Sequence, residues 1–231
     1  MRGQLALKTC RAARDCGYTI IVVDGSPSQE FKVALRDAGA TVIDQKMPGM
    51  GQSRRECINA GVDFGADVIV WLEPEKHPIV PLLDACIEPV ISGKADVVIP
   101  SRNTFTNYPK YQAESESRGN VAMGKLIGRS DLDFYIGPRV LSYDAAREMA
   151  LYDGKIEDEQ VYGDKWEILF IPLLWFIDYG WKIASVPVDY IHPIEQFVED
   201  DEIMRAKRDE QREVLVGAMT AEAKRLKLIT V

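Results

Sequence analysis

The sequence predicts an α/β fold built on a mostly parallel sheet with helices on both faces. Two observations predict it. Strand-like and helix-like segments alternate from residue 18 to residue 100, which is the pattern of a parallel sheet with crossover helices. The strand-like segments are also continuous β-branched runs, as expected for strands buried on both faces. A chain of 231 residues suits one such domain. We expect a first half of about residues 1–102, a second half of about 103–198 and a C-terminal helix of about 199–231.

Apolar runs and their breakers predict the elements of the first half. A basic, alanine-rich helix opens the chain over residues 1–17. Glycines at positions 39 and 93 end two of the later helices as C-caps. Strands are expected over residues 18–23, 40–43, 67–72 and 95–100, and helices over residues 28–38, 52–64 and 78–91.

The second half is less regular. Ser142 is a candidate N-cap for a helix to residue 151. Pro172 should kink or shift the apolar helix that contains it. Further helices are expected over residues 111–126, 165–179 and 200–228, strands over 132–136 and 182–188, and an acidic loop over 153–163.

Composition narrows the kinds of partner. The formal net charge of −8 argues against nucleic acid as the main partner. The longest apolar stretch, residues 168–177, is too short to span a bilayer, and residues 1–17 have no apolar core of a signal peptide. Cys10, Cys16, Cys57 and Cys86 form no C-x-x-C pair and are interpreted as reduced packing residues. We therefore expect a cytoplasmic protein without a transmembrane segment.

Two carboxylates follow the strand of residues 67–72. Glu73 and Glu75 are one residue apart at the end of a buried strand, where ligands of parallel sheets bind. Such a pair can hold a divalent cation that also takes phosphate oxygens. The alternative is a solvated acidic loop. His192, after the strand of residues 182–188, is either a structural histidine or a further metal ligand.

Two helix starts carry further candidate residues. Gly49 and Gly51 precede Arg54 and Arg55, and exposed N–H groups with guanidinium groups suit a diphosphate. At the start of the helix of residues 165–179, the acidic residues Asp164 and Glu167 are either dipole-complementing residues or a general base.

In this order, the segments resemble the family 2 glycosyltransferases of GT-A fold, in particular enzymes similar to dolichol-phosphate-mannose synthase and mannosylglycerate synthase. No single motif decides it; their order and spacing do. The similar segments are 20–26 (their V-V-D-D-G-S), 49–58 (G-K-G-x-A-x-R-x-G-I), 71–75 (F-L-D-x-D), 96–102 (D-V-V-x-G-S-R), 133–137 (D-x-x-x-G) and 180–187 (G-Y-x-I-x-x-V-P).

The resemblance implies transfer of a sugar from a UDP- or GDP-linked donor to a hydroxyl or phosphate acceptor. It implies a nucleotide-binding first half and an acceptor-side second half. Of the two acidic residues, Glu167 is favoured as the base because apolar residues follow it. The implied roles are donor binding by Asp24, Arg55, Glu73, Ser101 and Arg102, acceptor contacts by Arg118, Asp133 and Gly137, Mn²⁺ or Mg²⁺ ligation by Glu73, Glu75 and His192, and catalysis by Glu167 or Asp164.

The sequence departs from the family pattern at the metal motif and at the start. The D-x-D motif is E-x-E here, and the family's first strand is not found. A non-catalytic nucleotide-sugar-binding relative, or an inactive fragment, is therefore the alternative function, and a homo-oligomer is left open. We expect that another segment fills the gap between the strands beside the missing one, or that residues encoded before Met1 supply the missing strand.

Overall fold

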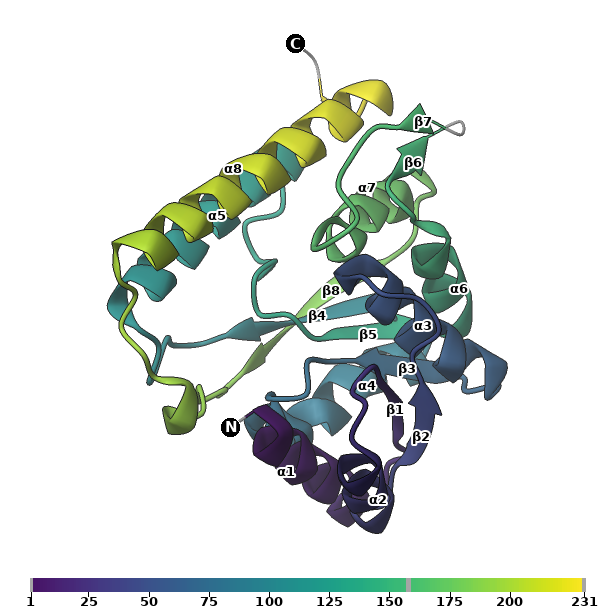
Figure 1. The fold of residues 1–231 in the computed structure, drawn as a ribbon. Helices are drawn as coiled ribbons and strands as arrows, with labels where there is room; N and C mark the ends of the chain where they lie inside the picture. Colours follow the sequence, from purple (N-terminus) through teal and green to yellow (C-terminus); the bar gives the residue numbers. More distant parts are fainter. Residues whose placement is uncertain (1, 157–158, 230–231) are drawn as a thin grey trace.

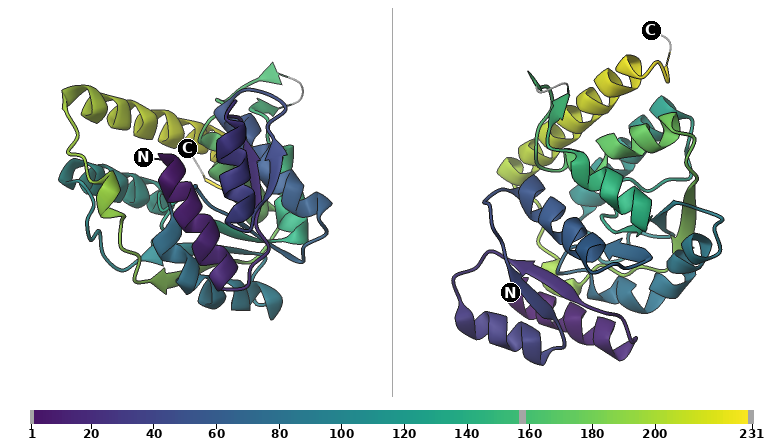
Figure 2. Two further views of the ribbon diagram at one scale, coloured as in Figure 1. Left: turned by 60° about the horizontal axis from the view of Figure 1, so that its bottom comes forward. Right: turned by 90° about the vertical axis from the view of Figure 1, so that its right-hand side faces the viewer.

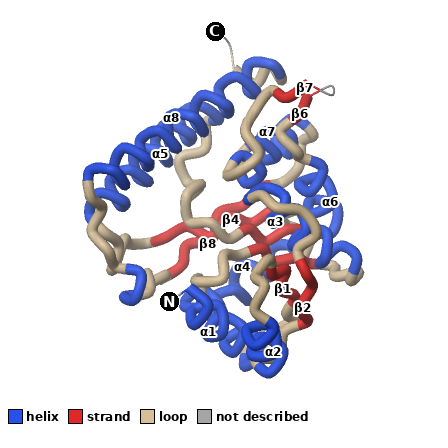
Figure 3. The backbone as a smooth tube through the Cα atoms, in the orientation of Figure 1, coloured by secondary structure: helices blue, strands red, loops and turns tan. Residues whose placement is uncertain are grey.

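The computed structural model describes residues 2–156 and 159–229 and has an α/β fold with helices around small sheets (Figures 1 and 3). The first half consists of α1 (Arg2–Asp15), β1 (Ile21–Asp24), α2 (Gln29–Asp37), β2 (Thr41–Asp44), α3 (Met50–Asp63), β3 (Val68–Trp71), the 3-10 helix η1 (His77–Leu82), α4 (Leu83–Ile91) and β4 (Val97–Arg102). The second half consists of α5 (Lys110–Ile127), β5 (Arg139–Ser142), α6 (Tyr143–Leu151), β6 (Lys155–Ile156), β7 (Glu159–Gln160), η2 (Glu167–Leu169), α7 (Ile171–Asp178), β8 (Ile183–Val188), η3 (Ile194–Gln196) and α8 (Glu202–Arg225).

The central sheet has four strands in the order β3-β5-β4-β8. β4 and β8 are parallel over their full length, but β5 lies antiparallel between β3 and β4. The sheet is therefore mixed, and the prediction of a mostly parallel sheet is wrong here. The sequence-based prediction missed β5 because the strand has only four residues: it begins directly after the turn at Gly137 and Pro138, and its last residue, Ser142, caps α6 with its side chain.

β1 and β2 form a separate parallel pair, in register from Ile21 opposite Thr41 to Asp24 opposite Asp44. Figure 1 shows this pair with α1 and α2 at the lower side of the molecule, and the right-hand view of Figure 2 shows the same four elements as one layer. This layer has its own small core, which includes Leu7, Cys10 and Leu35. The predicted single sheet is thus divided into two.

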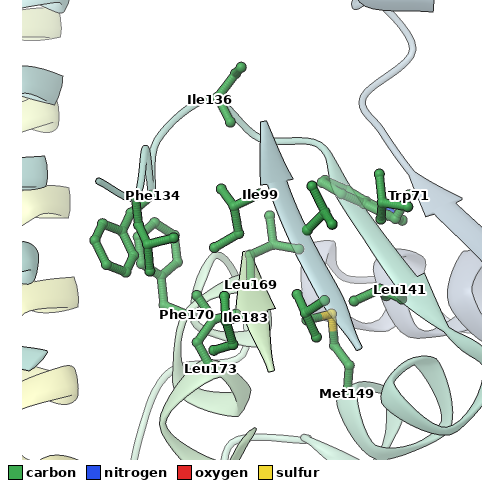
Figure 4. Packing of buried hydrophobic residues seen from close by; sticks show 14 of the residues in the cluster. Trp71, Ile99, Phe134, Ile136, Leu141, Met149, Leu169, Phe170, Leu173 and Ile183 are labelled. Atoms are coloured by element: carbon green, nitrogen blue, oxygen red, sulfur yellow. The ribbon is translucent and has the colours of Figure 1, made fainter. Parts of the chain in front are cut away.

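The larger core fills the space between the central sheet and its helices. Figure 4 shows Ile99 of the sheet near Leu169, Phe170 and Leu173, and Leu141 of the sheet beside Met149. α7 is apolar and almost fully buried, and burial of each large side chain contributes about 1.5–3 kcal/mol. Pro172 lies in the first turn of α7, where its missing N–H costs no helical hydrogen bond, so the apolar segment is divided into η2 and α7.

The long helix α8 packs along α5, as Figure 1 and the left-hand view of Figure 2 show. Asp201 caps its first turn by accepting a hydrogen bond from the N–H of Met204. Within α8, Glu222 is fully buried and accepts a hydrogen bond from the indole of Trp175 on α7. α8 therefore fixes α5 and α7 relative to each other.

Two further differences from the sequence-based prediction are local. Residues 132–136 form no strand; they are a turn that leads into β5. The predicted acidic loop of residues 153–163 contains the paired strands β6 and β7, although residues 157–158 lie outside the described part. Across residues 2–156 and 159–229, no helix combines the length and apolarity needed to cross a bilayer.

Candidate functional site

A cavity of about 1200 Å³ lies between β1 of the two-stranded sheet and β3 of the central sheet. It exceeds the range of roughly 300–1,000 Å³ that is common for small-molecule sites. We name two parts of it. The strand slot is the part lined by residues 20–23 and 68–72, and the polar end is the part lined by Arg54, Glu73, Lys76, Tyr135, His192 and Gln196.

The chain that leaves β3 delivers Glu73 and Lys76 to the polar end. The N–H of Lys76 donates to the carbonyl of Glu73 at 3.1 Å, so both side chains follow one tight turn before η1. Glu73 is 8% exposed, and its Oε2 atom has no hydrogen-bond partner among the described residues. Gly137 has a φ of +100°, and a Cβ atom there would overlap the Glu73 carboxylate, so glycine is required by this close approach.

Arg54 reaches the polar end from α3. Its guanidinium lies 4.1 Å from the ring centre of Trp166 and 5.4 Å from that of Trp71, and it donates to the carbonyl of Lys165 at 2.6 Å. Burial lowers the pKa of Arg54 to about 10, against the opposing charges of Glu73 and Glu167. Arg54 is therefore a buried, charged group at pH 7.

Lys76 is the second buried cation of the polar end. Its ammonium lies 5.1 Å from the ring centre of Tyr190. Burial alone would lower the pKa of Lys76, but Tyr108, Glu73 and Tyr190 raise it above its ordinary value. Lys76 therefore stays protonated at neutral pH.

His192 is neutral at pH 7. Burial, together with the nearby charges of Lys76 and Arg102, lowers its pKa to about 4. Its ring packs 4.2 Å from that of Tyr108, and its N–H in the main chain donates to the carbonyl of Thr106. Its Nδ1 atom has no hydrogen-bond partner among the described residues.

The charges that line the cavity leave an excess of positive charge. Arg2 is paired with Glu75, Arg208 with Asp200, and Glu116 with Arg102. Within the described part of the chain, Arg54 and Lys76 form no ion pair with a carboxylate, and Glu73 is the only unpaired acidic residue of the lining. Because unpaired buried charge is costly, two cations against one carboxylate favour an anionic ligand.

Unpartnered polar atoms are also concentrated here. Nine buried side-chain nitrogen or oxygen atoms of the described residues have no hydrogen-bond partner, and five of them belong to residues that line the cavity. These five are Arg54 Nε, Glu73 Oε2, Tyr135 Oη, His192 Nδ1 and Gln196 Oε1. Buried polar groups are normally satisfied, so this concentration favours a ligand that has several hydrogen-bonding groups.

The structure brings four of the predicted site residues to the cavity lining: Glu73, Glu75, Gly137 and His192. Asp24 ends β1 and accepts from Ser26, while its neighbours Val23 and Gly25 line the cavity. The others lie outside the lining: Arg55, Ser101, Arg102, Arg118, Asp133, Asp164 and Glu167.

Arg55 and Asp164 form an ion pair with each other. Arg55 donates to both carboxylate oxygens of Asp164, at 2.5 and 2.8 Å, and also to the carbonyl of Tyr152. Successive helical residues point about 100° apart, so Arg54 faces the cavity while Arg55 faces Asp164. The sequence-based prediction assigned the diphosphate to Arg55, whereas the arginine that lines the cavity is its neighbour Arg54.

Glu167 follows the lining residue Trp166 in the sequence and does not itself line the cavity. It is 4% exposed, and its Oε2 atom accepts the N–H of Lys165 at 2.8 Å. A Cβ atom on Gly163 would overlap its Oε1 side, so the chain packs closely around the carboxylate. Glu167 is thus one residue away from the cavity.

The remaining predicted residues form a supporting network or lie at the surface. Arg102 donates to both oxygens of Asp133, and Asn120 also donates to Asp133. This buried network fixes the turn that carries Tyr135 and Gly137. Arg118 is half-exposed and faces Asp209 of α8 at 3.6 Å, away from the cavity.

The predicted metal ligands do not form a ligand set. In the described part of the chain, no group of three or more His, Cys, Asp or Glu side chains is arranged to hold a metal ion. Glu75 pairs with Arg2, and the charges that act on His192 come from Lys76, Arg102 and Arg208. The residues present therefore do not fit a site made by Glu73, Glu75 and His192, and protein cations occupy the region instead.

Sequence reasoning missed most of the polar end. Lys76 directly follows Glu75 in the sequence, but its surroundings include Tyr108 and Tyr190, which are distant in sequence. Tyr135 and Gln196 carry no local motif. The phase of α3, readable from the burial of Ile58 four residues after Arg54, is the one signal that separates Arg54 from Arg55.

Comparison with known proteins finds a solved structure with a similar fold. No family model matches the chain, and no curated protein matches it. A solved structure described as the crystal structure of a mycobacterial protein is similar over 95% of this chain and 70% of that chain, with a TM-score of 0.59 and 11% sequence identity. At this identity the likeness concerns the fold alone.

Proposed function

We propose that the polar end binds the diphosphate of a nucleoside-diphosphate sugar and that the protein is a GT-A-like glycosyltransferase. One observation carries the proposal: two buried cations without carboxylate partners lie beside a carboxylate with a free oxygen, in one cavity of a protein whose net charge is −8. A diphosphate would pair with the two cations, and sugar hydroxyls would donate hydrogen bonds to the unpartnered acceptors. The order of the sequence motifs points to the same ligand class.

Four residues of the polar end have a proposed part in binding the donor. Arg54 and Lys76 neutralise the diphosphate, which is the leaving group. The Glu73 carboxylate accepts hydrogen bonds from hydroxyl groups of the donor, and the neutral imidazole of His192 accepts one hydrogen bond and donates another. Trp166 supports Arg54 by stacking on its guanidinium, so the cation is fixed before the ligand arrives.

The proposed reaction is a substitution at the anomeric carbon. The bond from that carbon to the diphosphate oxygen breaks, and its electron pair goes to the diphosphate. A bond forms from the acceptor oxygen to the anomeric carbon, and the acceptor proton passes to a carboxylate. Glu73 and Glu167 are the two candidates for this base, because Glu73 lines the cavity and Glu167 lies one residue behind it. The ion pair of Asp164 with Arg55 argues against Asp164 as the base.

A second candidate function is a non-catalytic nucleotide-sugar-binding protein. One observation favours it: both acidic residues of the expected acceptor helix are engaged, Asp164 by Arg55 and Glu167 by the main chain of Lys165. Such a protein would bind the donor and release no product.

The test combines binding and turnover. We expect UDP- or GDP-linked sugars to raise the melting temperature, since a ligand of the folded state stabilises it by RT ln(1 + [L]/Kd). Lys76→Met should weaken this binding about 10- to 100-fold, as expected for loss of a charge-assisted contact. Lys94→Met is the matched control, because Lys94 is exposed and pairs with Glu88 at the surface.

Turnover then separates the two candidates. Release of the nucleoside diphosphate in the presence of acceptor, lost in Glu73→Gln or Glu167→Gln, supports the transferase. Binding without any release supports the non-catalytic protein. No binding of any UDP- or GDP-linked sugar, or equal binding by wild type and Lys76→Met, contradicts both.

A further inference from the structure

We propose that the strand slot receives one extended, apolar polypeptide strand, which inserts between β1 and β3 and joins the two sheets. The proposal concerns the strand slot alone and does not rest on the proposed function of the polar end. The occupant is a peptide segment of β-branched and other apolar residues, recognised by its main chain and by its apolar side chains.

The first evidence is that two strand edges face the same cavity. β1 has β2 as its strand neighbour and β3 has β5, and the opposite edge of each carries no strand among the residues that the structure describes. The residues of each strand line the cavity consecutively, 20–23 on one side and 68–72 on the other. A cavity that lay over one face of a sheet would meet alternate residues, because successive side chains point to opposite faces. Consecutive lining therefore means that the cavity lies against the edges.

The second evidence is that the slot is apolar above and below. Ala6, Cys10 and Ala13 of α1 line it together with Val80 and Leu83, and Cys57 and Gly61 of α3 line it as well. A strand between the two edges would place its alternate side chains against apolar surroundings on both faces. Strands in such positions are continuous apolar runs, which defines the chemistry of the occupant.

The third evidence is the division of the hydrophobic core. The residues of β1 are all half-buried, although Ile21, Val22 and Val23 are apolar and belong to a strand. The buried residues fall into two separate clusters, one in the layer of α1, α2, β1 and β2 and one around the central sheet. An inserted apolar strand would contact both clusters and make them continuous.

Edges of this kind attract strands. Each edge presents a row of main-chain donors and acceptors, and an extended peptide satisfies them by forming a ladder. Two edges on opposite sides of one slot let a single strand form a ladder on both sides. β1 and β3 have four residues each, so an occupant of about four to six residues matches their length. The resulting sheet would have the order β2-β1-insert-β3-β5-β4-β8.

The experiment adds such a strand to the full chain. A segment of six valine and isoleucine residues is fused through a flexible glycine–serine linker to the N-terminus, and the same segment is added separately as a peptide with a solubilising lysine tail. The control replaces two of the six residues by proline, which cannot donate to a ladder.

Cysteine labelling reports the insertion directly. Cys10 and Cys57 line the cavity, whereas Cys16 is exposed outside its lining and serves as the internal control. We expect insertion to slow maleimide labelling of Cys57 and Cys10 at least tenfold and to leave Cys16 unchanged. Amide exchange of residues 21–24 and 68–71 should slow as well, in the fusion and, at sufficient concentration, with the free peptide.

The outcomes decide the proposal. Slower labelling and exchange with the valine–isoleucine strand but not with the proline control support it. Unchanged labelling and exchange in the fusion overturn it, and so do equal effects of the proline control, because that result would mean non-specific apolar contact. Nucleotide-sugar binding is measured on the same samples, so that failure of the strand and failure of the polar end are distinguished.

Discussion

At the scale of single residues, buried His192 in the polar end makes the stability of the folded protein depend on pH. Its pKa is about 4 in the folded protein, below the ordinary value near 6.5. A depressed pKa means that the unfolded chain binds the proton first as pH falls. The stability that neutral His192 contributes is therefore complete above about pH 6.5 and is lost as pH falls toward 4.

The expected loss is on the order of 1–3 kcal/mol between pH 6.5 and pH 4. Denaturant unfolding at several pH values measures it. In His192→Asn this part of the pH dependence should disappear, while His77→Asn, at the half-buried second histidine, should retain it. An unchanged pH profile in His192→Asn would show that His192 is not buried in its neutral form.

Gly137 gives a second prediction at this scale. Gly137→Ala places a Cβ atom on the Glu73 carboxylate and forces a left-handed φ on an alanine. We expect a loss of about 1–3 kcal/mol in unfolding free energy and weaker nucleotide-sugar binding, because Glu73 must move. Gly217→Ala is the matched control: this exposed glycine lies inside α8 with open space around it, so alanine should stabilise the protein by about 0.5–1 kcal/mol. Equal stability of wild type and Gly137→Ala would contradict the close contact.

At the scale of elements, the pair of Arg55 and Asp164 fastens α3 to the segment before η2. The Arg55 side chain is 12% exposed and that of Asp164 is 32% exposed, so solvent screens the pair only partly. Asp164→Asn should cost about 1–3 kcal/mol of stability, since Arg55 then loses its charged partner.

This prediction also distinguishes a structural role from catalysis. Arg55→Met alone and combined with Asp164→Asn should reveal a coupling energy in a double-mutant cycle of unfolding free energies. Turnover per folded molecule should remain in Asp164→Asn. Loss of turnover with unchanged stability would return Asp164 to the role of base.

Elements also show how far sequence reasoning reaches. Periodicity, glycine C-caps and the Ser142 N-cap placed most helices and strands within a few residues, because these signals are local. β5 was not predictable in this way, since a strand of four residues that begins after a turn and ends at a helix cap carries no detectable period. Among site residues, strand ends predicted Glu73, while the burial of Lys76 arises from residues more than thirty positions away.

At the scale of the whole molecule, the sequence predicted the α/β class but not the division into two sheets. Alternation of strand-like and helix-like segments predicts which elements exist. The pairing of strands depends on which strand edges meet in space. Among the described residues, β1 and β3 are edge strands of their sheets, and residues of both strands line the cavity. The polar end lies where both strands finish, so one cavity combines an apolar slot with a charged end.

Calorimetric titration of nucleoside mono- and diphosphates measures whether Arg54 and Lys76 hold the diphosphate of a nucleotide ligand, as we propose. UDP and UMP, and GDP and GMP, are each titrated into wild type and Lys76→Met. We predict that the second phosphate strengthens binding of the preferred nucleotide about tenfold or more in wild type and adds little in Lys76→Met. If the second phosphate adds the same affinity to both proteins, or none to wild type, the polar end is not a diphosphate site and the account of this cavity is wrong.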